Sequence, residues 1–338
     1  MRLVTYSAAL LGVASLLALP AAIAAERVQV VTSFSILADM VENVGGDHVA
    51  VTSLVGADGD THVYSPSPRD AQAVAEADLV VFNGLQFEGW MERLIDASDH
   101  DGLLVIATEG VERLSRGQAH DDHAHDDDHS HDDEHGHDEH ASHDDHGDDD
   151  PHAWQDLAMG KVYVVNIRDG LMEADPDNSD AYTENAERYL QAIEATHAEI
   201  RERLTEIPPD TSVITGHDSF GYFANAYGLR FLSPVGLSTE GDASAADMAR
   251  LIDVIREENV GALFHENMTS PAMIEQLAEE TGLPIAGTLY ADALASEGDA
   301  STWLGMMRHN AEVLHEALAA PGHSPNDDHA HGDDDHDH

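Results

Sequence analysis

The sequence predicts an α/β protein with two β/α lobes, each holding a parallel-type sheet covered by helices. Short runs of β-branched and apolar residues alternate with helix-like segments, first over residues 28–107 and again over residues 212–319. A long helical pattern at residues 179–207 separates the two series. We therefore expect two similar lobes that are joined by one long backbone helix.

The first series follows the order of strand, helix, strand that builds a parallel sheet with crossover helices. Each expected strand is a short run rich in valine, isoleucine or leucine, and each expected helix has its apolar residues on one side. We expect strands at residues 28–32, 50–55, 78–82 and 103–107, and helices at residues 36–44, 68–77 and 90–95.

The long helix is predicted by residues that recur mostly at steps of three and four. This stripe consists of Tyr182, Ala186, Tyr189, Leu190, Ile193, His197, Ile200 and Leu204. At about 1.5 Å per residue the helix would be roughly 43 Å long, which is enough to connect two lobes. Pro208 and Pro209 end it, because proline cannot continue a helix.

The second series repeats the alternation of the first series. The apolar runs are short, and turn-forming residues separate them from the helical patterns. We expect strands at residues 212–215, 231–235, 262–265 and 285–289, and helices at residues 220–227, 245–257, 271–281 and 301–319.

Three segments fall outside the two lobes. Residues 1–25 have a basic start, a short apolar run and a small-residue end, which is typical of a secretory signal peptide and not of a membrane anchor. Residues 117–150 and 321–338 are rich in His and Asp and lack apolar periodicity, so we expect a disordered loop and a disordered tail. The chain then divides into signal peptide, N-terminal lobe with its loop (26–178), linking helix (179–207), C-terminal lobe (208–320) and tail.

Charge and cysteine content exclude several classes of partner and site. The chain has 66 acidic and 15 basic residues, which excludes nucleic acid and anionic membranes as partners. It has no cysteine, which removes disulfides, thiolate metal ligands and a lipid-modified N-terminal cysteine. We expect a monomer that is exported to the periplasm and stays there without a lipid anchor.

The His/Asp-rich loop is the plainest chemical signal. Closely spaced imidazoles chelate cations, and imidazole favours Zn²⁺, Ni²⁺ and Cu²⁺ over Mn²⁺ or Ca²⁺. Interleaved acids would suffice for a solubilising linker, so the histidines indicate an accessory site that collects or senses metal. Its candidate ligands are His120, His123, His125, His129, His131, His135, His137, His140, His143 and His146.

Three histidines outside the loop and tail lie in unusual Gly-, Pro- and Asp-rich settings. His62 and His217 follow predicted strands, and in open α/β sheets the carboxyl ends of the strands form the ligand crevice. His152 lies between Pro151 and Ala153. His265 ends a predicted strand beside Glu266, which makes this pair further candidates for the site or for the surroundings of its ligands.

Several motifs, in order, resemble those of the metal-binding receptors of ABC importers, the group that carries zinc or manganese and includes adhesion-type lipoproteins. The resemblance extends from about residue 28 to residue 318. The matching segments are residues 61–66 with Pro68 and Asp70, residues 77–81 with Asn83, Gly84, Phe87 and Glu88, residues 150–154, residues 216–222 and residues 289–294.

This resemblance implies a metal buried in the cleft between the lobes. Carried over by position, the ligands are His62 and His152 from the first lobe, and His217 and Asp292 from the second. The sequence departs from the usual pattern at Gly59-Asp60-Thr61 and at Gln155-Asp156-Leu157, where we expect no ligand to be lost. The histidine loop between the first two ligands is typical of the zinc branch.

The resemblance predicts a receptor that delivers Zn²⁺ to an inner-membrane ABC permease with its ATPase, with a periplasmic zinc chaperone as a further candidate partner. Three imidazoles and one carboxylate suit tetrahedral zinc, whereas a second carboxylate oxygen would suit Mn²⁺ or Fe²⁺. The alternatives are a manganese or iron receptor, a periplasmic zinc buffer or chaperone, and a metallohydrolase. The last is disfavoured, because Glu266 is the only obvious general base.

Overall fold

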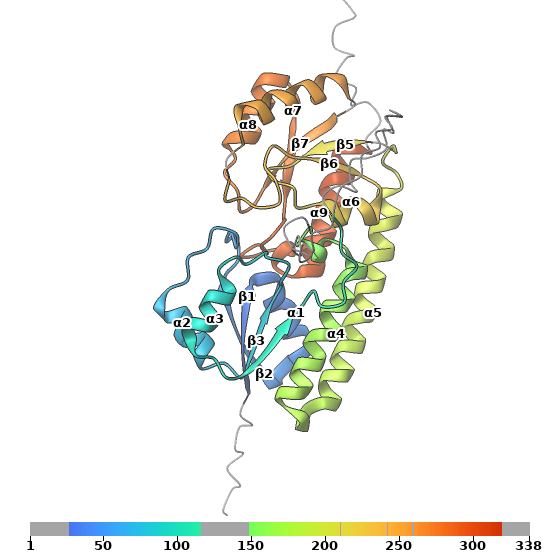
Figure 1. Cartoon of the computed structure of the whole chain (residues 1–338). Helices are drawn as coiled ribbons and strands as arrows, with labels where there is room; N and C mark the ends of the chain where they lie inside the picture. Colours follow the sequence, from blue (N-terminus) through green and yellow to red (C-terminus); the bar gives the residue numbers. More distant parts are fainter. Residues whose placement is uncertain (1–26, 116–148, 210, 242, 259, 320–338) are drawn as a thin grey trace, which may run out of the picture.

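The computed structural model describes residues 27–115 and 149–319, apart from residues 210, 242 and 259. The expected signal peptide, the ten histidines of the loop and the expected tail lie outside the described residues. The predicted helices and strands are present with ends that differ by no more than about three residues. The two-lobed α/β fold is thereby confirmed (Figure 1).

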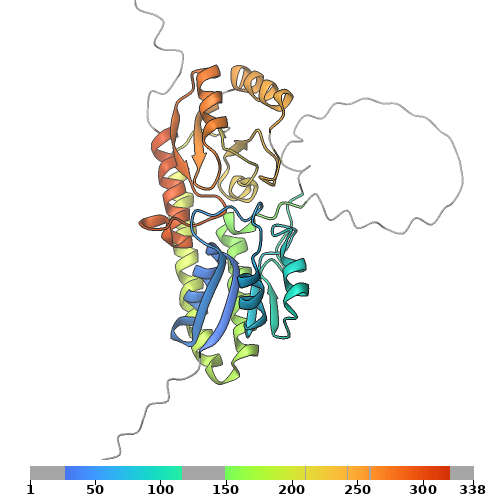
Figure 2. The same cartoon turned by 90° about the vertical axis from the view of Figure 1, so that its left-hand side faces the viewer.

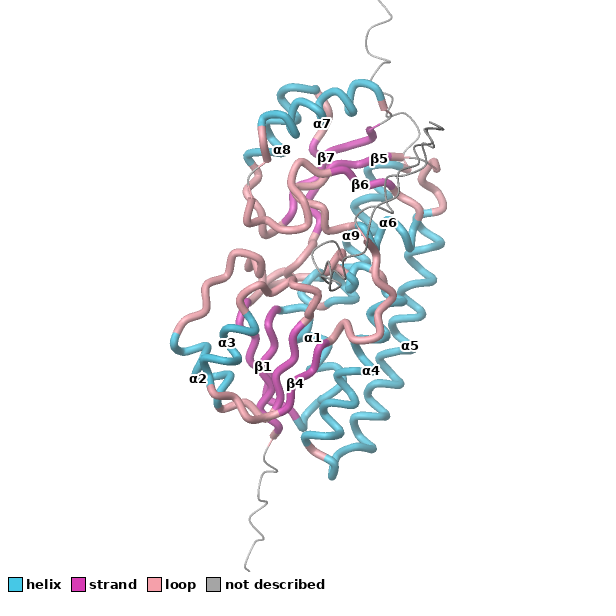
Figure 3. Tube along the Cα trace, viewed as in Figure 1, coloured by secondary structure: helices cyan, strands magenta, loops and turns pink. Residues whose placement is uncertain are grey.

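The N-terminal lobe contains a parallel sheet of four strands in the order β2-β1-β3-β4. Helices pack around this sheet, so its central strands are buried (Figure 3). The strands are β1 (Val28–Phe34), β2 (Val49–Val55), β3 (Leu79–Phe82) and β4 (Leu103–Ile106), and the first helices are α1 (Ser35–Gly45), α2 (Pro68–Ala75) and α3 (Met91–Ser98).

The C-terminal lobe has the equivalent sheet, with the order β6-β5-β7-β8 and again parallel pairing. In both sheets the chain leaves the first strand to one side and returns on the other, so each has a switch point where ligands commonly bind. The strands are β5 (Ser212–Ile214), β6 (Arg230–Leu232), β7 (Val260–Glu266) and β8 (Ile285–Leu289), with helices α6 (Gly221–Tyr227), α7 (Ala245–Glu257), α8 (Ala272–Thr281) and α9 (Trp303–Leu318).

Two long helices run beside the lobes. One is the predicted linking helix, α5 (Ser179–Leu204), which continues past both lobes in the two views of Figures 1 and 2. The other, α4 (Leu157–Ala174), packs against α5 and was not predicted. It has buried residues facing the sheet, α1 and α5, so no single apolar stripe marks it in the sequence.

Close packing of α4 depends on its glycines. A Cβ atom on Gly160 would lie 2.1 Å from the indole of Trp303, and one on Gly170 would lie 2.4 Å from the side chain of Val105. These glycines therefore let α4 approach both α9 and β4. No helix in the described part of the chain is both long enough and apolar enough to cross a membrane.

The buried side chains form two clusters of unequal size. The larger one joins the N-terminal sheet, α1, α4, α5 and α9 to one face of the C-terminal sheet. The smaller cluster fills the other face of the C-terminal sheet under α7 and α8, with Leu251, Leu263 and Leu277 among its members. Side chains of the N-terminal lobe, the two long helices and part of the C-terminal lobe thus form one continuous core.

Candidate metal centre

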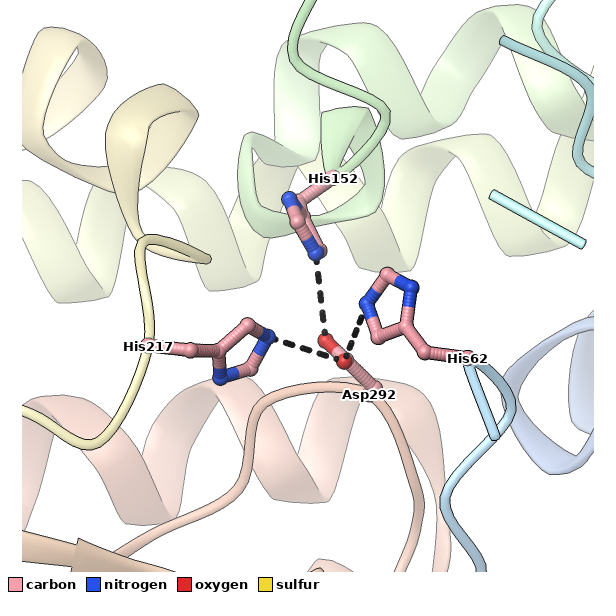
Figure 4. A group of neighbouring side chains, drawn as sticks. All are labelled: His62, His152, His217 and Asp292. Atoms are coloured by element: carbon pink, nitrogen blue, oxygen red, sulfur yellow. Dashed lines mark hydrogen bonds and ion pairs between the residues drawn. The ribbon is translucent and has the colours of Figure 1, made fainter. Parts of the chain in front are cut away.

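Four loops bring His62, His152, His217 and Asp292 together between the lobes (Figure 4). His62 lies between β2 and α2, and His152 precedes a short 3-10 helix before α4. His217 follows β5 and Asp292 follows β8, each at the carboxyl end of a parallel strand. One ligand atom from each of the four lies within 4.8 Å of the others.

The distances around Asp292 are those of atoms that can share one ion. Its Oδ2 lies 3.1 Å from Nε2 of His217 and 3.3 Å from Nε2 of His62, while its Oδ1 lies 3.7 Å from Nε2 of His152. Ligands of a tetrahedral zinc ion with bonds of about 2.0–2.2 Å are roughly 3.3–3.6 Å apart. The side chains are therefore already grouped at a spacing suited to a small cation.

The group is shielded from water and incompletely satisfied by the protein. His62 is 7% exposed and the other three residues are at most 1% exposed. Nε2 of His62, Nε2 of His152 and Oδ1 of Asp292 are buried and lack a hydrogen-bond partner among the described residues. Because buried polar atoms are normally paired, these atoms indicate a shared ligand at their centre.

Two carboxylates lie behind the imidazoles and fix their orientation. Nδ1 of His217 lies 2.6 Å from Oε2 of Glu266, and Nδ1 of His152 lies 2.7 Å from Oδ1 of Asp150. When Nδ1 donates its proton to the carboxylate, Nε2 is left as a lone-pair donor that faces the centre. This carboxylate–histidine arrangement is the one that orients metal ligands and strengthens their basicity.

Mutual charge sets the protonation of His217 and Asp292. Burial disfavours the ionised form of Asp292, but the nearby His217 and His152 outweigh burial and hold the pKa of Asp292 well below 3.8. Burial also disfavours protonated His217, but Glu266 and Asp292 outweigh burial and raise the pKa of His217 well above 6.5. A proton on His217 therefore competes with a cation for the same nitrogen.

A buried network positions the two histidines of the N-terminal lobe. The ring of Phe87 lies 4.8 Å from His62 and 5.8 Å from His152, centroid to centroid. Before it, Gly84, Leu85 and Gln86 all have positive φ, and the Glu88 carboxylate accepts hydrogen bonds from the backbone N–H groups of residues 83 and 84. Non-glycine residues in this conformation cost about 1–2 kcal/mol each, so the carboxylate stabilises a strained turn beside the site.

Asp292 is held from the side of the N-terminal lobe. Nε1 of Trp154 donates to the carbonyl oxygen of Ala291 at 2.9 Å, and Nε2 of Gln155 donates to the same oxygen at 2.8 Å. Gln155 is one of the departures from the usual pattern, and its amide here supports the residue next to Asp292. Asp292 therefore stays within the group although the sequence differs from the usual pattern at Gln155.

The structure places the sequence candidates as follows. The four proposed ligands lie together, and Glu266 contacts one of them. His265 is not in the group, because neighbouring residues of a strand point to opposite faces of the sheet. The loop histidines lie outside the described residues. Asp150 was quoted only as part of a motif, and its position two residues before a histidine was the available signal for its role.

Fold and site together define a metal-binding substrate-binding protein with its cargo site between two lobes. A family model described as ZnuA, "Zinc-uptake complex component A periplasmic", matches residues 30–317. The chain belongs to this family of substrate-binding proteins of ABC metal importers, whose members are receptors and not enzymes. The family works with an ABC permease and its ATPase.

Similar proteins from several bacteria match most of the chain. The manganese-binding lipoprotein MntA of Halalkalibacterium halodurans is 31% identical over 297 residues, which are 87% of this chain and 89% of that protein. The iron-binding protein YfeA of Yersinia pestis is 29% identical over 294 residues, 86% of each chain. The structure of the periplasmic zinc binding protein TroA from Treponema pallidum matches with a TM-score of 0.75 and 26% identity, covering 87% of this chain and all of that one.

Proposed function

We propose that this metal receptor binds Zn²⁺ with high affinity and delivers it to its importer, with His62, His152, His217 and Asp292 as ligands. The observation that carries the proposal is the buried group of three imidazole nitrogens and one carboxylate at the spacing of a four-coordinate ion. Zinc accepts a tetrahedral set of nitrogen and oxygen ligands and has no geometric preference that this group would violate.

The His/Asp-rich loop gives separate support for zinc over other cargo. Residues 120–150 contain ten histidines, and imidazole ligands favour zinc over manganese. We propose that these residues collect metal outside the cleft, as an accessory to the tight site. The family description and the name of the TroA structure also refer to zinc.

Manganese or iron is the second candidate cargo, and one structural observation favours it. Both oxygens of Asp292 face the histidines, Oδ2 toward His62 and His217 and Oδ1 toward His152. A carboxylate that binds through both oxygens raises the coordination number, which suits Mn²⁺ and Fe²⁺ better than tetrahedral zinc. MntA and YfeA are named for manganese and iron, respectively.

We further propose that the protein acts in the periplasm without a lipid anchor, as a monomer, and that a zinc chaperone is a candidate donor. MntA is named a lipoprotein, whereas this chain contains no cysteine to carry a lipid. The leader at residues 1–25 supports export. The pieces we treat as domains are the lobes 26–178 and 208–320 with the linking helix between them.

The proposal is tested by titration calorimetry with Zn²⁺ and Mn²⁺ on three forms of the mature protein. These are the wild type, a His62→Ala/His217→Ala double variant, and a variant in which residues 118–147 are replaced by a short Gly/Ser linker. The deletion must spare Asp149 and Asp150, because the first pairs with Ser115 and the second orients His152. That same pairing brings the ends of the deleted segment together.

We expect one tight zinc site in the wild type and in the deletion, and its loss in the double variant, which should keep only weak sites. Tight binding that disappears with the deletion and survives in the double variant would instead identify a zinc buffer. A wild type that binds Mn²⁺ more tightly than Zn²⁺ in direct competition would assign the receptor to the second candidate cargo.

A further inference from the structure

A pocket of about 450 Å³ adjoins the metal centre on the side of the C-terminal lobe. It lies at the carboxyl ends of β5, β6 and β7, which is the switch point of that sheet. His217 lines it, whereas the other three candidate ligands do not. His217 is therefore the wall that the pocket shares with the metal centre.

The lining of the pocket suits a hydrated cation. Its ionisable lining residues are Asp60 and His217, and no lysine or arginine is among the lining residues. Three methionines, Met248, Met268 and Met273, add thioether sulfurs, which are ligands for soft metals, and hydroxyl groups complete the wall. A water molecule occupies about 30 Å³, so the pocket has room for an ion with its first hydration shell.

One hydrogen bond crosses between the lobes at this pocket. The hydroxyl of Thr239 in the C-terminal lobe donates to Oδ2 of Asp60 at 2.8 Å. The other oxygen of Asp60 accepts the backbone N–H of His62 at 3.0 Å. Asp60 thus connects the most exposed of the four candidate ligands to the loop after β6 in the other lobe.

We propose that this pocket is the route by which the cation enters and leaves the buried centre, and that the Thr239–Asp60 hydrogen bond is the latch that closes it. The proposal rests on the proposed function, in that the cation is the cargo. The cation meets the Asp60 carboxylate and the sulfurs first, loses part of its hydration there, and passes to the centre when the loop carrying Thr239 separates from Asp60. Thr239 is a positioning residue in this scheme and not a ligand.

The test measures zinc exchange rates on the mature full-length protein. Thr239→Val keeps the shape of the side chain and removes the donor. Zinc dissociation into excess chelator, followed by stopped-flow absorbance, should accelerate about tenfold, since a hydrogen bond to a charged acceptor can account for such a factor. Because the same hydrogen bond would hinder passage in both directions, association should also accelerate, and the equilibrium dissociation constant should change by less than about threefold.

The matched control is Asp58→Gly, which removes another hydrogen bond between the lobes. Oδ1 of Asp58 accepts from Nδ2 of Asn267 at 3.1 Å, outside the pocket lining, and glycine tolerates the positive φ of residue 58. This control should leave both rates unchanged. Rates in Thr239→Val equal to those of the wild type, or an equal acceleration in Asp58→Gly, would refute the latch.

A second variant tests the route itself. Met273→Lys places a positive charge in the pocket wall and should slow zinc association about tenfold, with an unchanged midpoint of thermal unfolding. Gln72→Lys adds the same charge on an exposed position of α2 and should leave association unchanged. Equal association rates in the two variants would overturn the route. A wild type without one tight zinc site would instead overturn the proposed function, on which the route depends.

Discussion

Three of the four candidate ligands are fixed to the larger core, and the fourth is fixed to the C-terminal lobe. His62 and His152 pack on Phe87 within the larger cluster. Asp292 comes from the C-terminal half of the sequence, but Trp154 and Gln155 hold the carbonyl group of the residue before it. By sequence each lobe supplies two candidate ligands, whereas in space three of the four are attached to the larger core.

The loop of Asp292 has a second attachment to the N-terminal lobe. The backbone N–H of Leu294 donates to Oγ of Ser35 at the start of α1, and the backbone N–H of Asp58 donates to the carbonyl oxygen of Leu294. Neither bond involves the smaller core under α7 and α8. The loop of Asp292 is thus attached to the N-terminal lobe at several points, and also to its own lobe, where Asn267 donates to the carbonyl oxygen of Ala293.

His217 is held in another way. Glu266 accepts from its backbone N–H and from its ring, and Thr215 and Ser219 donate to its carbonyl oxygen. All of these residues belong to the C-terminal lobe. Because only His217 is held entirely from the C-terminal lobe, a shift of this lobe would withdraw its imidazole first, which is enough to weaken metal binding without dismantling the rest of the site.

The largest expected effect comes from removing a candidate ligand, whether it is fixed to the larger core, as Asp292 is, or to the C-terminal lobe, as His217 is. Asp292→Ala and His217→Ala should each weaken zinc binding by more than about a hundredfold, which exceeds the loss typical of a residue that only orients a ligand. Competition with a chromophoric chelator gives the two affinities. Near-wild-type affinity in either variant would show that the residue is not a ligand, whichever core supports it.

The next largest effects are expected at the two carboxylates that orient His152 and His217. Asp150→Asn and Glu266→Gln should each weaken zinc binding about 10- to 100-fold. Each carboxylate holds both the ring and the backbone of its histidine, but His152 also packs on Phe87, so we expect the larger loss for Glu266→Gln. The same chelator competition measures both, and a larger loss for Asp150→Asn would contradict the assignment of weaker support to His217.

The sequence was sufficient for the parts of this arrangement that depend on local pattern. Strand β3 is a continuous apolar run, and β1 is mostly apolar. His62 and His217 follow predicted strands, so the fold and two candidate ligands could be found from local pattern. The full set of four ligands needed the resemblance to a family. Helix α4 could not be predicted, because it is buried on several sides and contains two glycines that face other elements.

The contacts between the two lobes that hold the site could not be predicted from the sequence either. The bond from Trp154 to Ala291 joins residues 137 positions apart, and that between Thr239 and Asp60 joins residues 179 apart. Such pairs are set by the packing of the two lobes and not by any local pattern. Asp150 is an exception, since it lies two residues from His152 and bonds both its backbone and its ring.

The third prediction concerns a substitution that should destabilise the larger core, which supports three of the four candidate ligands. Gly160→Ala forces a methyl group against Trp303, whose indole donates to the carbonyl oxygen of Trp154. We expect a loss of about 1–3 kcal/mol in the free energy of unfolding, the usual cost of overpacking. Gly56→Ala is the control, because a Cβ there meets no atom within 4 Å. Denaturant unfolding measures both, and equal midpoints would show that α4 does not need the glycine.

The smallest effect concerns the proton on His217. Glu266 and Asp292 raise its pKa, so the ring holds a proton more readily than a free imidazole, and zinc must displace that proton to bind the ring nitrogen. Zinc affinity should therefore fall as the pH falls, by at most about tenfold per pH unit for one proton. The sign for stability without metal is the opposite: the contribution of His217 is fully present below pH 6.5 and is lost as the pH rises through its folded pKa.

Calorimetry at pH 7 in two buffers of different ionisation enthalpy counts the released protons. We expect about one proton in the wild type and in Asp150→Asn, and fewer in Glu266→Gln, because Glu266 is the first of the two carboxylates that raise the pKa of His217. Asp292 does not contribute a proton, since its pKa is held well below 3.8 and it is ionised at pH 7. A release that is unchanged in Glu266→Gln would show that the displaced proton comes from a group other than His217.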